Sequence, residues 1–296
     1  MTTLTIASVQ YGLGSRNGLT GIESAEHYWD GLASTIKEAA AQGANLVVFP
    51  EYVTAHLLAF TPAMSNEEAC EYLDSFTAVY EKFFLEQSRE THMIIVGGTH
   101  ICKEHDDYVN KAHMFFPDGR VETQNKFHLT PEEKQRWKLR GGNALNMIDT
   151  EWGKVAILTC YDIEFPEIAR IAAKKGAELI LCPSYTDTAA GYHRVRNCCQ
   201  ARAIENQFFV QLSGIVGSMS EPRPQIDEGH CQAGVFSSCD FPFPSDGILG
   251  VGTVNENMIV YTTIDFAQLR QNREHGIVAP FYDRRQDLYD REELDL

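Results

Sequence analysis

Three reactive side chains, a glutamate, a lysine and a cysteine, each follow or end an apolar strand predicted from the sequence. Glu51 ends the segment NLVVFPEY, Lys126 follows VETQN, and Cys160 stands between the apolar run 155–158 and a helix that begins near Pro166. In a parallel α/β sheet, ligands bind at such strand ends. A carboxylate can accept the proton of a thiol, and a lysine can stabilise a thiolate and a developing oxyanion. If they converge, the three residues could carry out nucleophilic catalysis through Cys160.

Each of these residues also has an ordinary structural interpretation. Most free cysteines are small buried hydrophobic side chains, and Glu and Lys at strand ends usually face solvent. A helix N-terminus lowers the pKa of a nearby thiol, which favours a reactive Cys160. The positions alone leave both interpretations open.

The elements that must position these residues alternate between strand and helix. Such βα units occur before about residue 110 and again after about residue 150, and no linker between them is rich in Gly, Ser or Pro. Alternation of this kind indicates an α/β fold. Two sheets packed together, each covered outside by helices, would form a four-layer α-β-β-α sandwich. We expect one domain at 1–270 and an acidic C-terminal arm at 271–296, solvated or crossing to a partner subunit.

Three segments carry specific local predictions. Thr20 with Glu23, and Ser65 with Glu68, have the spacing of a capping box that opens a helix. The second of these helices is predicted to continue to Phe83, with its apolar residues on one face. Residues 217–230 lack periodicity and are predicted to form a long loop, either disordered or a lid over a site.

Composition excludes several classes of function. The chain has 296 residues, 44% hydrophobic residues and a formal net charge of −16. This negative charge argues against nucleic-acid and anionic-membrane partners. Neither a signal peptide nor a membrane-spanning run is visible. The eight cysteines are therefore expected to be thiols in a cytoplasmic protein. His100, Cys102 and His105 match no common zinc spacing, so we expect no metal.

Several motifs, in order along the chain, resemble the nitrilase, or carbon–nitrogen hydrolase, superfamily. They are IASVQ at the start, FPEY at 49–52, VNKAHMFFPDGRV, NKFHLTPEE at 125–133, CYDIEFPE at 160–167 and RAIENQFFV at 202–210. The resemblance implies an α-β-β-α sandwich with a catalytic triad of Glu51, Lys126 and Cys160, and neither a metal nor an organic cofactor. It also implies a second glutamate, for which Glu133 has the fitting offset, although Glu132 is its immediate neighbour.

The implied mechanism uses Glu51 to take the proton of Cys160, which attacks a carbonyl carbon. Lys126 and the backbone N–H of Tyr161 would hold the oxyanion while ammonia or an amine leaves. Water would then hydrolyse the thioester, with Glu133 orienting substrate or helping proton transfer.

The motifs indicate the branch of the superfamily less directly than the superfamily itself. Nitrilases usually have Trp-Glu after the cysteine, whereas this chain has Tyr161-Asp162, which resembles the amidase and carbamoylase branches. KFHLTPEEKQRW resembles a nitrilase pattern instead. We favour a small amide or carbamoyl substrate. The alternatives are a nitrilase acting on a C≡N group, and a non-catalytic or redox-sensing protein in which Cys160 forms a sulfenate or a disulfide.

Substrate-binding residues are expected beside the catalytic segments. The candidates are Tyr52, His56, Trp137, Tyr185, Asp187, Tyr192, His193 and Arg194. Asp187 could pair with a substrate amine, and Arg194 or Arg196 with a carboxylate, although either could form a structural ion pair. We expect a homodimer or larger homo-oligomer, with the helix at 164–175 as the contact.

Overall fold

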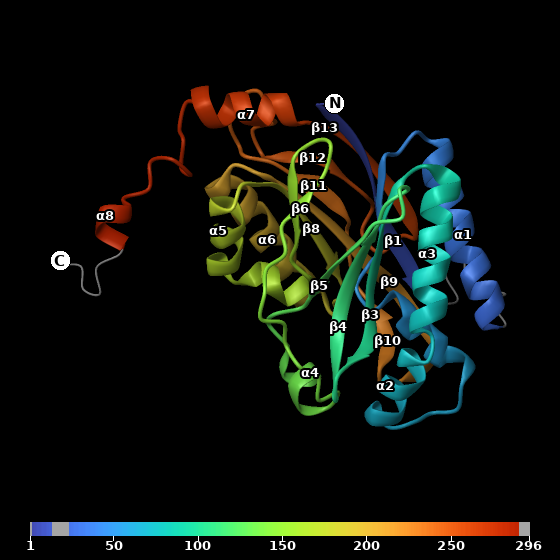
Figure 1. Ribbon diagram of the computed structural model, residues 1–296. Helices are drawn as coiled ribbons and strands as arrows, with labels where there is room; N and C mark the ends of the chain where they lie inside the picture. Colours follow the sequence, from blue (N-terminus) through green and yellow to red (C-terminus); the bar gives the residue numbers. More distant parts are fainter. Residues whose placement is uncertain (1, 14–23, 290–296) are drawn as a thin grey trace.

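Two halves of the chain each form a sheet with helices on its outer face (Figure 1). The computed structural model describes residues 2–13 and 24–289. Its strands are hydrogen-bonded in the order β5-β4-β3-β2-β1-β9-β8-β7-β6. Strands β1 and β9 are parallel and join the two halves between the pairs Gln10↔Gly214 and Leu13↔Gly217.

The first half contains the helices α1 to α3 and a short α4. Its elements are β1 (Thr3–Leu13), α1 (Ala25–Ala41), β2 (Leu46–Val48), the 3-10 helix η1 (Val53–Phe60), α2 (Asn66–Asp74), α3 (Thr77–Thr91), β3 (Ile94–Glu104), β4 (Asp107–Phe115), β5 (Val121–Asn125) and α4 (Pro131–Gln135). Parallel pairing of β1, β2 and β3 places the carboxyl ends of these strands at one edge of the sheet.

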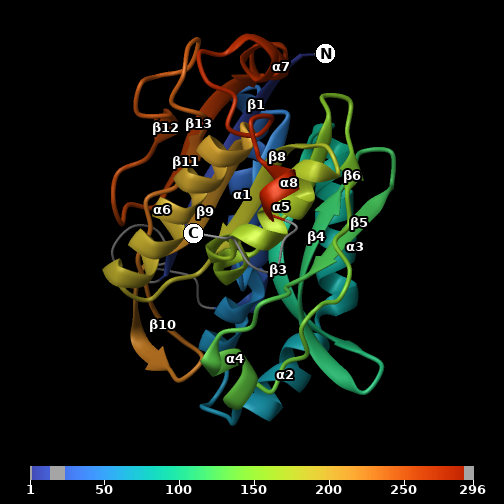
Figure 2. The same cartoon turned by 90° about the vertical axis from the view of Figure 1, so that its left-hand side faces the viewer.

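The second half repeats the alternation of strand and helix and ends in antiparallel strands. Its elements are β6 (Ile148–Asp149), β7 (Lys154–Ile157), the 3-10 helix η2 (Cys160–Glu164), α5 (Pro166–Lys174), β8 (Ala177–Ser184), α6 (Ala189–Asn206), β9 (Phe209–Arg223), β10 (Ile226–Gly229), β11 (Gly234–Phe236), β12 (Ile248–Val251), β13 (Met258–Asp265), α7 (Phe266–His275) and α8 (Gln286–Tyr289). Figure 2 shows α5 and α6 in front of the strands of this half.

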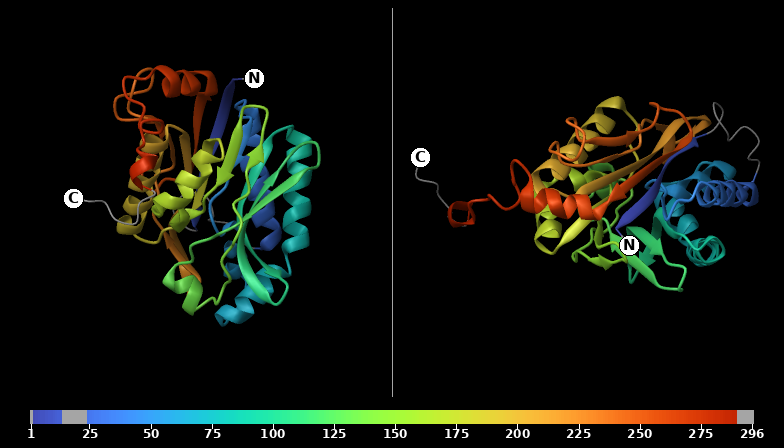
Figure 3. Two further views of the ribbon diagram at one scale, coloured as in Figure 1. Left: turned by 60° about the vertical axis from the view of Figure 1, so that its left-hand side comes forward. Right: turned by 90° about the horizontal axis from the view of Figure 1, so that it is seen from above.

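Three buried apolar clusters explain the layers. One cluster packs α1, α2 and α3 on the outer face of the first sheet, through residues such as Leu32, Tyr80 and Ile95. A second lies between the sheets, where Ile6 and Val48 of the first half belong to the same cluster as Leu181 of the second. The third packs α5 and α6 on the outer face of the second sheet. The four-layer α-β-β-α sandwich expected from the sequence is therefore confirmed, and the view from above in Figure 3 shows the two outer helix layers.

The helix expected from Ser65 to Phe83 is two helices. Ser65 and Glu68 do form the capping box at the start of α2, but α2 ends at Asp74 and α3 starts at Thr77. The Ser75 hydroxyl donates to the backbone carbonyl of Tyr72 at 2.6 Å. This bond offers the chain a local alternative to the helical ladder. The other expected capping box, Thr20 with Glu23, lies outside the described residues, and α1 is capped by Ser24.

The prediction of a long loop at 217–230 is wrong. Strand β9 continues to Arg223 and pairs with β10 as an antiparallel hairpin, with Gly229 opposite Gly217. The pairing is made by backbone groups, so it does not require alternating side chains. A sequence with two prolines and several charges conceals such a strand from hydrophobic periodicity.

The C-terminal segment returns to the surface of α5. Helix α7 runs across the boundary that we expected after residue 270. The Phe281 ring lies 5.8 Å from the guanidinium carbon of Arg170, and Lys174 Nζ donates to Gln286 Oε1 at 3.1 Å. Residues 290–296 lie outside the described residues, and the role of this arm stays a prediction. In the described parts of the chain, no helix has both the length and the apolar character needed to cross a membrane.

Candidate active site

Cys160 stands at a sharp turn between strand β7 and helix α5. Its backbone φ is +48°. This angle lies in the left-handed region, which residues other than glycine seldom adopt. Strain of this kind persists when the surrounding structure enforces it, and it is common at functional sites. The turn leaves the thiol 5% exposed, with Sγ 3.5 Å from the backbone carbonyl of Tyr185.

Glu51 is positioned where β2 ends beside β3. Gly98 of β3 has a φ of +68°, and a Cβ there would overlap the Pro50 carbonyl oxygen. Only glycine permits this close approach. The next residue after Glu51, Tyr52, donates its N–H to Thr99 Oγ1 at 2.9 Å. These contacts direct the Glu51 carboxylate, which is 1% exposed, toward Lys126.

Lys126 lies between two carboxylates. Its Nζ is 2.8 Å from Oε1 of Glu51 and 2.9 Å from Oε2 of Glu133, and all three side chains are buried. A buried charge is costly unless it is paired and hydrogen-bonded, and here the pairing is complete on both sides. The cation can therefore remain ionised in the interior.

Of the two neighbouring glutamates, Glu133 reaches Lys126 and Glu132 does not. Thr130 and Glu133 form a capping box at the start of α4, in which Thr130 N–H donates to Glu133 Oε2 at 2.8 Å. The neighbouring Glu132 points to the rim of the cavity and pairs with Arg136 at 3.8 Å. Tyr52 also donates its hydroxyl hydrogen to Glu133.

Two further groups hold Glu51. The Asn110 amide donates from Nδ2 to Glu51 Oε1 at 2.8 Å, and the backbone N–H of Tyr185 donates to Glu51 Oε2 at 3.0 Å. Both carboxylate oxygens are thus fixed in direction. A base with a fixed lone pair can accept a proton from one position without reorganising.

The protonation states follow from burial and neighbouring charge. Burial raises the pKa of Glu51, against the opposing effect of Lys126. Burial would lower the pKa of Lys126, but the carboxylates of Glu133 and Glu51 raise it well above its ordinary value. Burial and the Glu51 charge raise the pKa of Cys160 well above that of a free thiol. These shifts favour the thiol form of Cys160, which could act as a nucleophile only with the help of a base.

Asp162 connects the turn that carries Cys160 to the segment that carries Lys126. Its carboxylate is fully buried and accepts the backbone N–H of Phe127 at 3.2 Å and that of His128 at 2.7 Å. It also accepts the N–H of Thr159 at 3.2 Å, directly before Cys160. One carboxylate therefore fixes the relative position of two segments that approach from different sheets.

A cavity of about 480 Å³ opens onto Cys160, Lys126 and Glu51. Of the expected substrate-binding residues, it is lined by Tyr52, Trp137, Tyr185, Asp187 and Arg194. Tyr161, the expected oxyanion donor, lines it too. The ring of Tyr52 stacks on that of Trp137, with 5.9 Å between centroids, so these aromatic side chains form one wall.

Three other candidates lie away from this cavity. Tyr192 is 2% exposed and directs its hydroxyl group to Gln232, because it occupies a buried position of α6. His56 is buried against the ring of Tyr28, with 5.3 Å between centroids. His193 is exposed on α6. None of the three lines the cavity, and their part in substrate binding stays a prediction. Tyr192 and His193 point away from it although Arg194 on the same helix lines it, since adjacent positions of a helix point in different directions.

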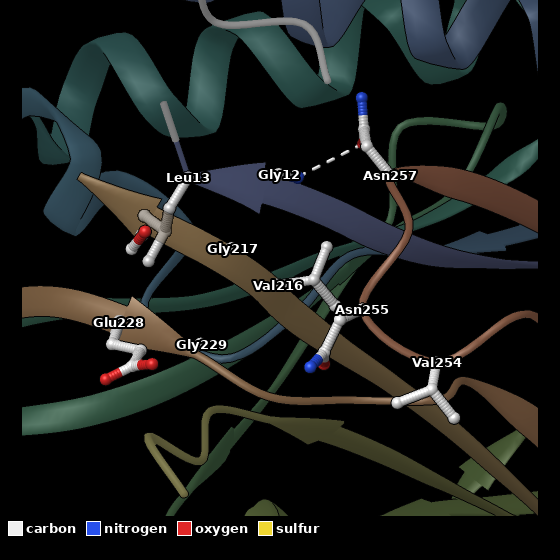
Figure 4. Close-up of a pocket in the computed structure, with 10 residues that line it drawn as sticks. Gly12, Leu13, Val216, Gly217, Glu228, Gly229, Val254, Asn255 and Asn257 are labelled. Atoms are coloured by element: carbon white, nitrogen blue, oxygen red, sulfur yellow. Dashed lines mark hydrogen bonds between the residues drawn. The ribbon is translucent and has the colours of Figure 1, made fainter. Parts of the chain in front are cut away.

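A second cavity, of about 370 Å³, lies beside the ends of β1 and β10 and the middle of β9 (Figure 4). It is lined by glycines, apolar residues, asparagines, Ser218 and Glu228. Gly12 N–H donates to Asn257 Oδ1 at 3.1 Å across its edge. No nucleophile is paired with a base among the described lining residues, so the first cavity is the stronger candidate for an active site.

The histidine and cysteine residues near position 100 do not converge on one point. His100 is buried between the hydroxyl groups of Thr54 and Thr77, at 2.8 and 2.9 Å. His105 lies in the turn after β3, with a φ of +58°. Within residues 2–13 and 24–289, no group of three or more His, Cys, Asp or Glu side chains has a metal-binding arrangement.

The fold is thus a four-layer sandwich with a buried glutamate, lysine and cysteine beneath a cavity. The sequence pattern of the family described as Carbon-nitrogen hydrolase matches residues 5–273. The chain belongs to this family, which confirms the resemblance noted in the sequence and its assignment to an enzyme family of carbon–nitrogen hydrolases.

Relatives and solved structures agree with this assignment. The chain is 38% identical over 268 residues to "Probable hydrolase YhcX" of Bacillus subtilis, covering 90% of this chain but 52% of that relative, so it spans about half of that protein's length. It is 30% identical to "Omega-amidase NIT2" of Danio rerio, covering 86% of this chain and 87% of the relative. The carbon-nitrogen hydrolase of Helicobacter pylori has the same fold, with a TM-score of 0.78, 21% identity and 97% of each chain covered. An amidase from Nesterenkonia sp. also shares the fold, with a TM-score of 0.72, 20% identity and coverage of 97% of this chain and 95% of that one.

Sequence reasoning missed two of the residues that organise the site. Asn110 lies inside an ordinary strand, and Asp162 was noted only as a marker of the branch. For Asp162 the position, two residues after the nucleophile, was a usable signal. For Asn110 the signal was an amide side chain inside the motif VNKAHMFFPDGRV.

Proposed function

We propose that the chain hydrolyses the C–N bond of a small amide or carbamoyl compound through a thioester on Cys160. The observation that carries this proposal is the position of Lys126 between Glu51 and Glu133, at 2.8 and 2.9 Å, at the floor of the cavity that contains the thiol. Two similar proteins, an omega-amidase and an amidase, support an amide substrate.

In the first half of the reaction Glu51 takes the proton from Cys160, and Sγ forms a bond to the substrate carbonyl carbon. The carbonyl π electrons move to oxygen, where Lys126 Nζ and the N–H of Tyr161 stabilise the charge. As the C–N bond breaks, Glu51 returns the proton to the leaving ammonia or amine. The products are a thioester on Cys160 and a free amine.

In the second half water attacks the thioester. Glu51 takes a proton from the water, the new C–O bond forms, and the tetrahedral oxyanion occupies the same donors. The C–S bond then breaks and Cys160 regains its proton from Glu51. Glu133 remains ionised throughout, because Lys126 lowers its pKa against the effect of burial, and it keeps Lys126 charged and in place.

The charges around the cavity favour a substrate that carries an amine. Arg136 pairs with Glu132, and Arg194 pairs with Glu164 at 3.3 Å. Asp187 and Asp227 line the same cavity without an ion-pair partner among the described residues. We therefore assign Asp187 to a substrate amine, with Asp227 beside it, and we interpret Arg194 as a structural ion pair.

The alternatives from the sequence make different predictions. A nitrilase would use the same cysteine to attack a C≡N carbon. Trp137, which ends the nitrilase-like segment KFHLTPEEKQRW, lines the cavity, so the assay includes nitriles. A redox-sensing thiol needs a low pKa and exposure. Cys160 has a raised pKa and is 5% exposed, which favours the hydrolase.

An ammonia-release assay on small amides, carbamoyl amines and nitriles tests the proposal. We expect turnover of amides or carbamoyl amines by the natural chain and none by Cys160→Ala. Iodoacetamide labelling of Cys160 without turnover of any compound would overturn the hydrolase and favour the redox-sensing or binding protein. Turnover of nitriles alone would select the nitrilase.

The cytoplasmic location and the homo-oligomer stay predictions. Helix α5, the expected contact, has Ile171 44% exposed on its outer face. Sedimentation of the protein at micromolar concentration checks this expectation, and a monomer would contradict it.

A further inference from the structure

We propose that Asn110 is a positioning residue that fixes the two glutamates of the site on either side of Lys126. The inference rests on the proposed function, in which Glu51 is the base. It adds a residue that lies within β4 and outside the triad.

The Asn110 side chain bridges the same two carboxylates as Lys126. Its Nδ2 donates to Glu51 Oε1 at 2.8 Å and to Glu133 Oε1 at 3.1 Å. The side chain is 1% exposed, so these bonds form away from bulk water. A neutral amide and a cation together therefore hold two negative groups that would otherwise repel each other.

The backbone of Asn110 also holds Lys126. The carbonyl oxygen of Asn110 accepts the N–H of Lys126 at 2.9 Å. Strands β4 and β5 are antiparallel with Lys111 opposite Asn125, so Asn110 faces Lys126 one position further along. The strand pairing thus sets the distance between the amide donor and the lysine. The placement of Glu51, Glu133 and Lys126 therefore depends on Asn110.

The orientation of the amide supports a role in the site. Asn110 Oδ1 is buried and has no hydrogen-bond partner among the described residues. A flipped amide would place this oxygen against two carboxylates, so the charges select the orientation with Nδ2 toward them. An unsatisfied buried acceptor is unfavourable. The donor bonds of Nδ2 to Glu51 and Glu133 offset this cost.

A chemical consequence follows from these bonds. A hydrogen bond to a carboxylate stabilises its ionised form, so Asn110 keeps Glu51 available as a base. Several titratable groups also face Glu51. They are Lys126 after β5, Glu133 of α4, Tyr52 before η1, Cys160 of η2 and Cys182 of β8. Among the groups that contact the Glu51 side chain, Asn110 supplies an uncharged side-chain donor, and its removal changes no formal charge.

The test compares Asn110→Leu with Asn206→Leu. Asn206 is also a fully buried amide, but it donates to the Arg202 carbonyl within α6 and does not line the cavity. The measured quantity is the pH dependence of Cys160 alkylation by iodoacetamide, with Glu51→Gln identifying the acid limb that belongs to Glu51. We expect Asn110→Leu to move this limb upward by about one pH unit and to lower kcat by about tenfold. Asn206→Leu should lower the melting temperature without moving the limb.

An unchanged acid limb in Asn110→Leu would overturn the proposal, whatever its melting temperature. If Asn110→Leu does not fold, Asn110→Asp is used instead, because it keeps the shape of the side chain and adds a third carboxylate. The acid limb of alkylation in Asn110→Asp should move further upward. An acid limb at the position of the natural chain would again overturn the proposal. Alkylation needs no substrate. If no amide is turned over by any variant, the proposed function fails while the alkylation profile still decides the role of Asn110.

Discussion

Oδ1 of Asp162 accepts the backbone N–H of His128 at 2.7 Å and lies 3.0 Å from the ring Nδ1 of the same histidine. His128 in turn stacks on Phe165, with 3.8 Å between ring centroids. This contact attaches the lysine segment to the turn that carries Cys160. The spacing of Cys160 and Lys126 therefore depends on Asp162, which has no step of its own in the proposed reaction.

The substitution Asp162→Asn should separate these two segments. It removes the charge that accepts several buried N–H groups, so we expect a loss of about 2–4 kcal/mol in the free energy of unfolding and a fall in kcat of about 10- to 100-fold. Urea unfolding and the ammonia-release assay measure the two effects.

The control for Asp162 is Asp149→Asn, at a carboxylate that is 76% exposed in its pair with Lys154. Exposed ion pairs contribute little, so this substitution should change the free energy of unfolding by less than about 0.5 kcal/mol. Equal effects of the two substitutions would contradict the role of Asp162.

Removal of the buried cation should damage both activity and stability. Lys126→Met leaves Glu51 and Glu133 without their shared partner, and loss of one oxyanion donor costs about 100- to 1,000-fold in kcat. Loss of one partner of a buried pair costs about 3–5 kcal/mol of stability. Single-turnover kinetics and thermal unfolding check both numbers. Lys154→Met, a surface lysine that is 45% exposed, is the control. Activity within a factor of two of the natural chain would exclude Lys126 from the reaction.

The acid limb of activity should lie above the usual titration range of a glutamate. Glu51 must be ionised to accept a proton, and burial raises its pKa above the ordinary value of 4.5. Activity is therefore present above the raised pKa and is lost as the pH falls through it. The pH dependence of kcat/KM measures this limb. A limb at or below the ordinary glutamate pKa of 4.5 would mean that another group is the base.

Substitution at the cavity rim should change substrate preference rather than chemistry. We expect Asp187→Asn and Asp227→Asn each to raise KM for amides with a distal amine by about 3- to 10-fold, with kcat nearly unchanged. Neutral amides of the same length should be bound as before. Glu228→Gln, on the same hairpin but in the second cavity, is the matched control. A similar increase in KM for neutral and cationic amides would exclude charge recognition.

The pH dependence of stability offers an independent check on Glu133. Lys126 lowers the pKa of Glu133 in the folded state, despite burial. A carboxyl with a lowered folded-state pKa contributes stability above its unfolded pKa, and this contribution is lost as the pH falls through the folded value. Glu133→Gln should therefore reduce the loss of stability on acidification below the ordinary glutamate pKa of 4.5. Urea unfolding at several pH values measures this difference, and an unchanged slope would contradict it.

Local pattern in the sequence predicted the architecture and drew attention to three reactive residues, and the family resemblance implied their roles. The apolar runs and βα units predicted the sandwich, and Glu51, Lys126 and Cys160 were recognisable because polar groups at strand ends interrupt an apolar pattern. The limits of individual helices and strands were predicted less accurately. The hairpin of β9 and β10 was missed because backbone pairing leaves no periodic side-chain signal.

The tertiary structure decided which neighbours complete the site. Adjacent residues of a helix point about 100° apart, so only the docking of α4 selects Glu133 over Glu132, and only the packing of α6 turns Tyr192 away from the cavity. Asn110 meets Lys126 through strand pairing, and Asp162 meets His128 across two segments far apart in the chain. The sequence by itself determined the kinds of side chain available for chemistry and the strands that carry them. Their distances depend on long-range packing, which no local pattern of residues encodes.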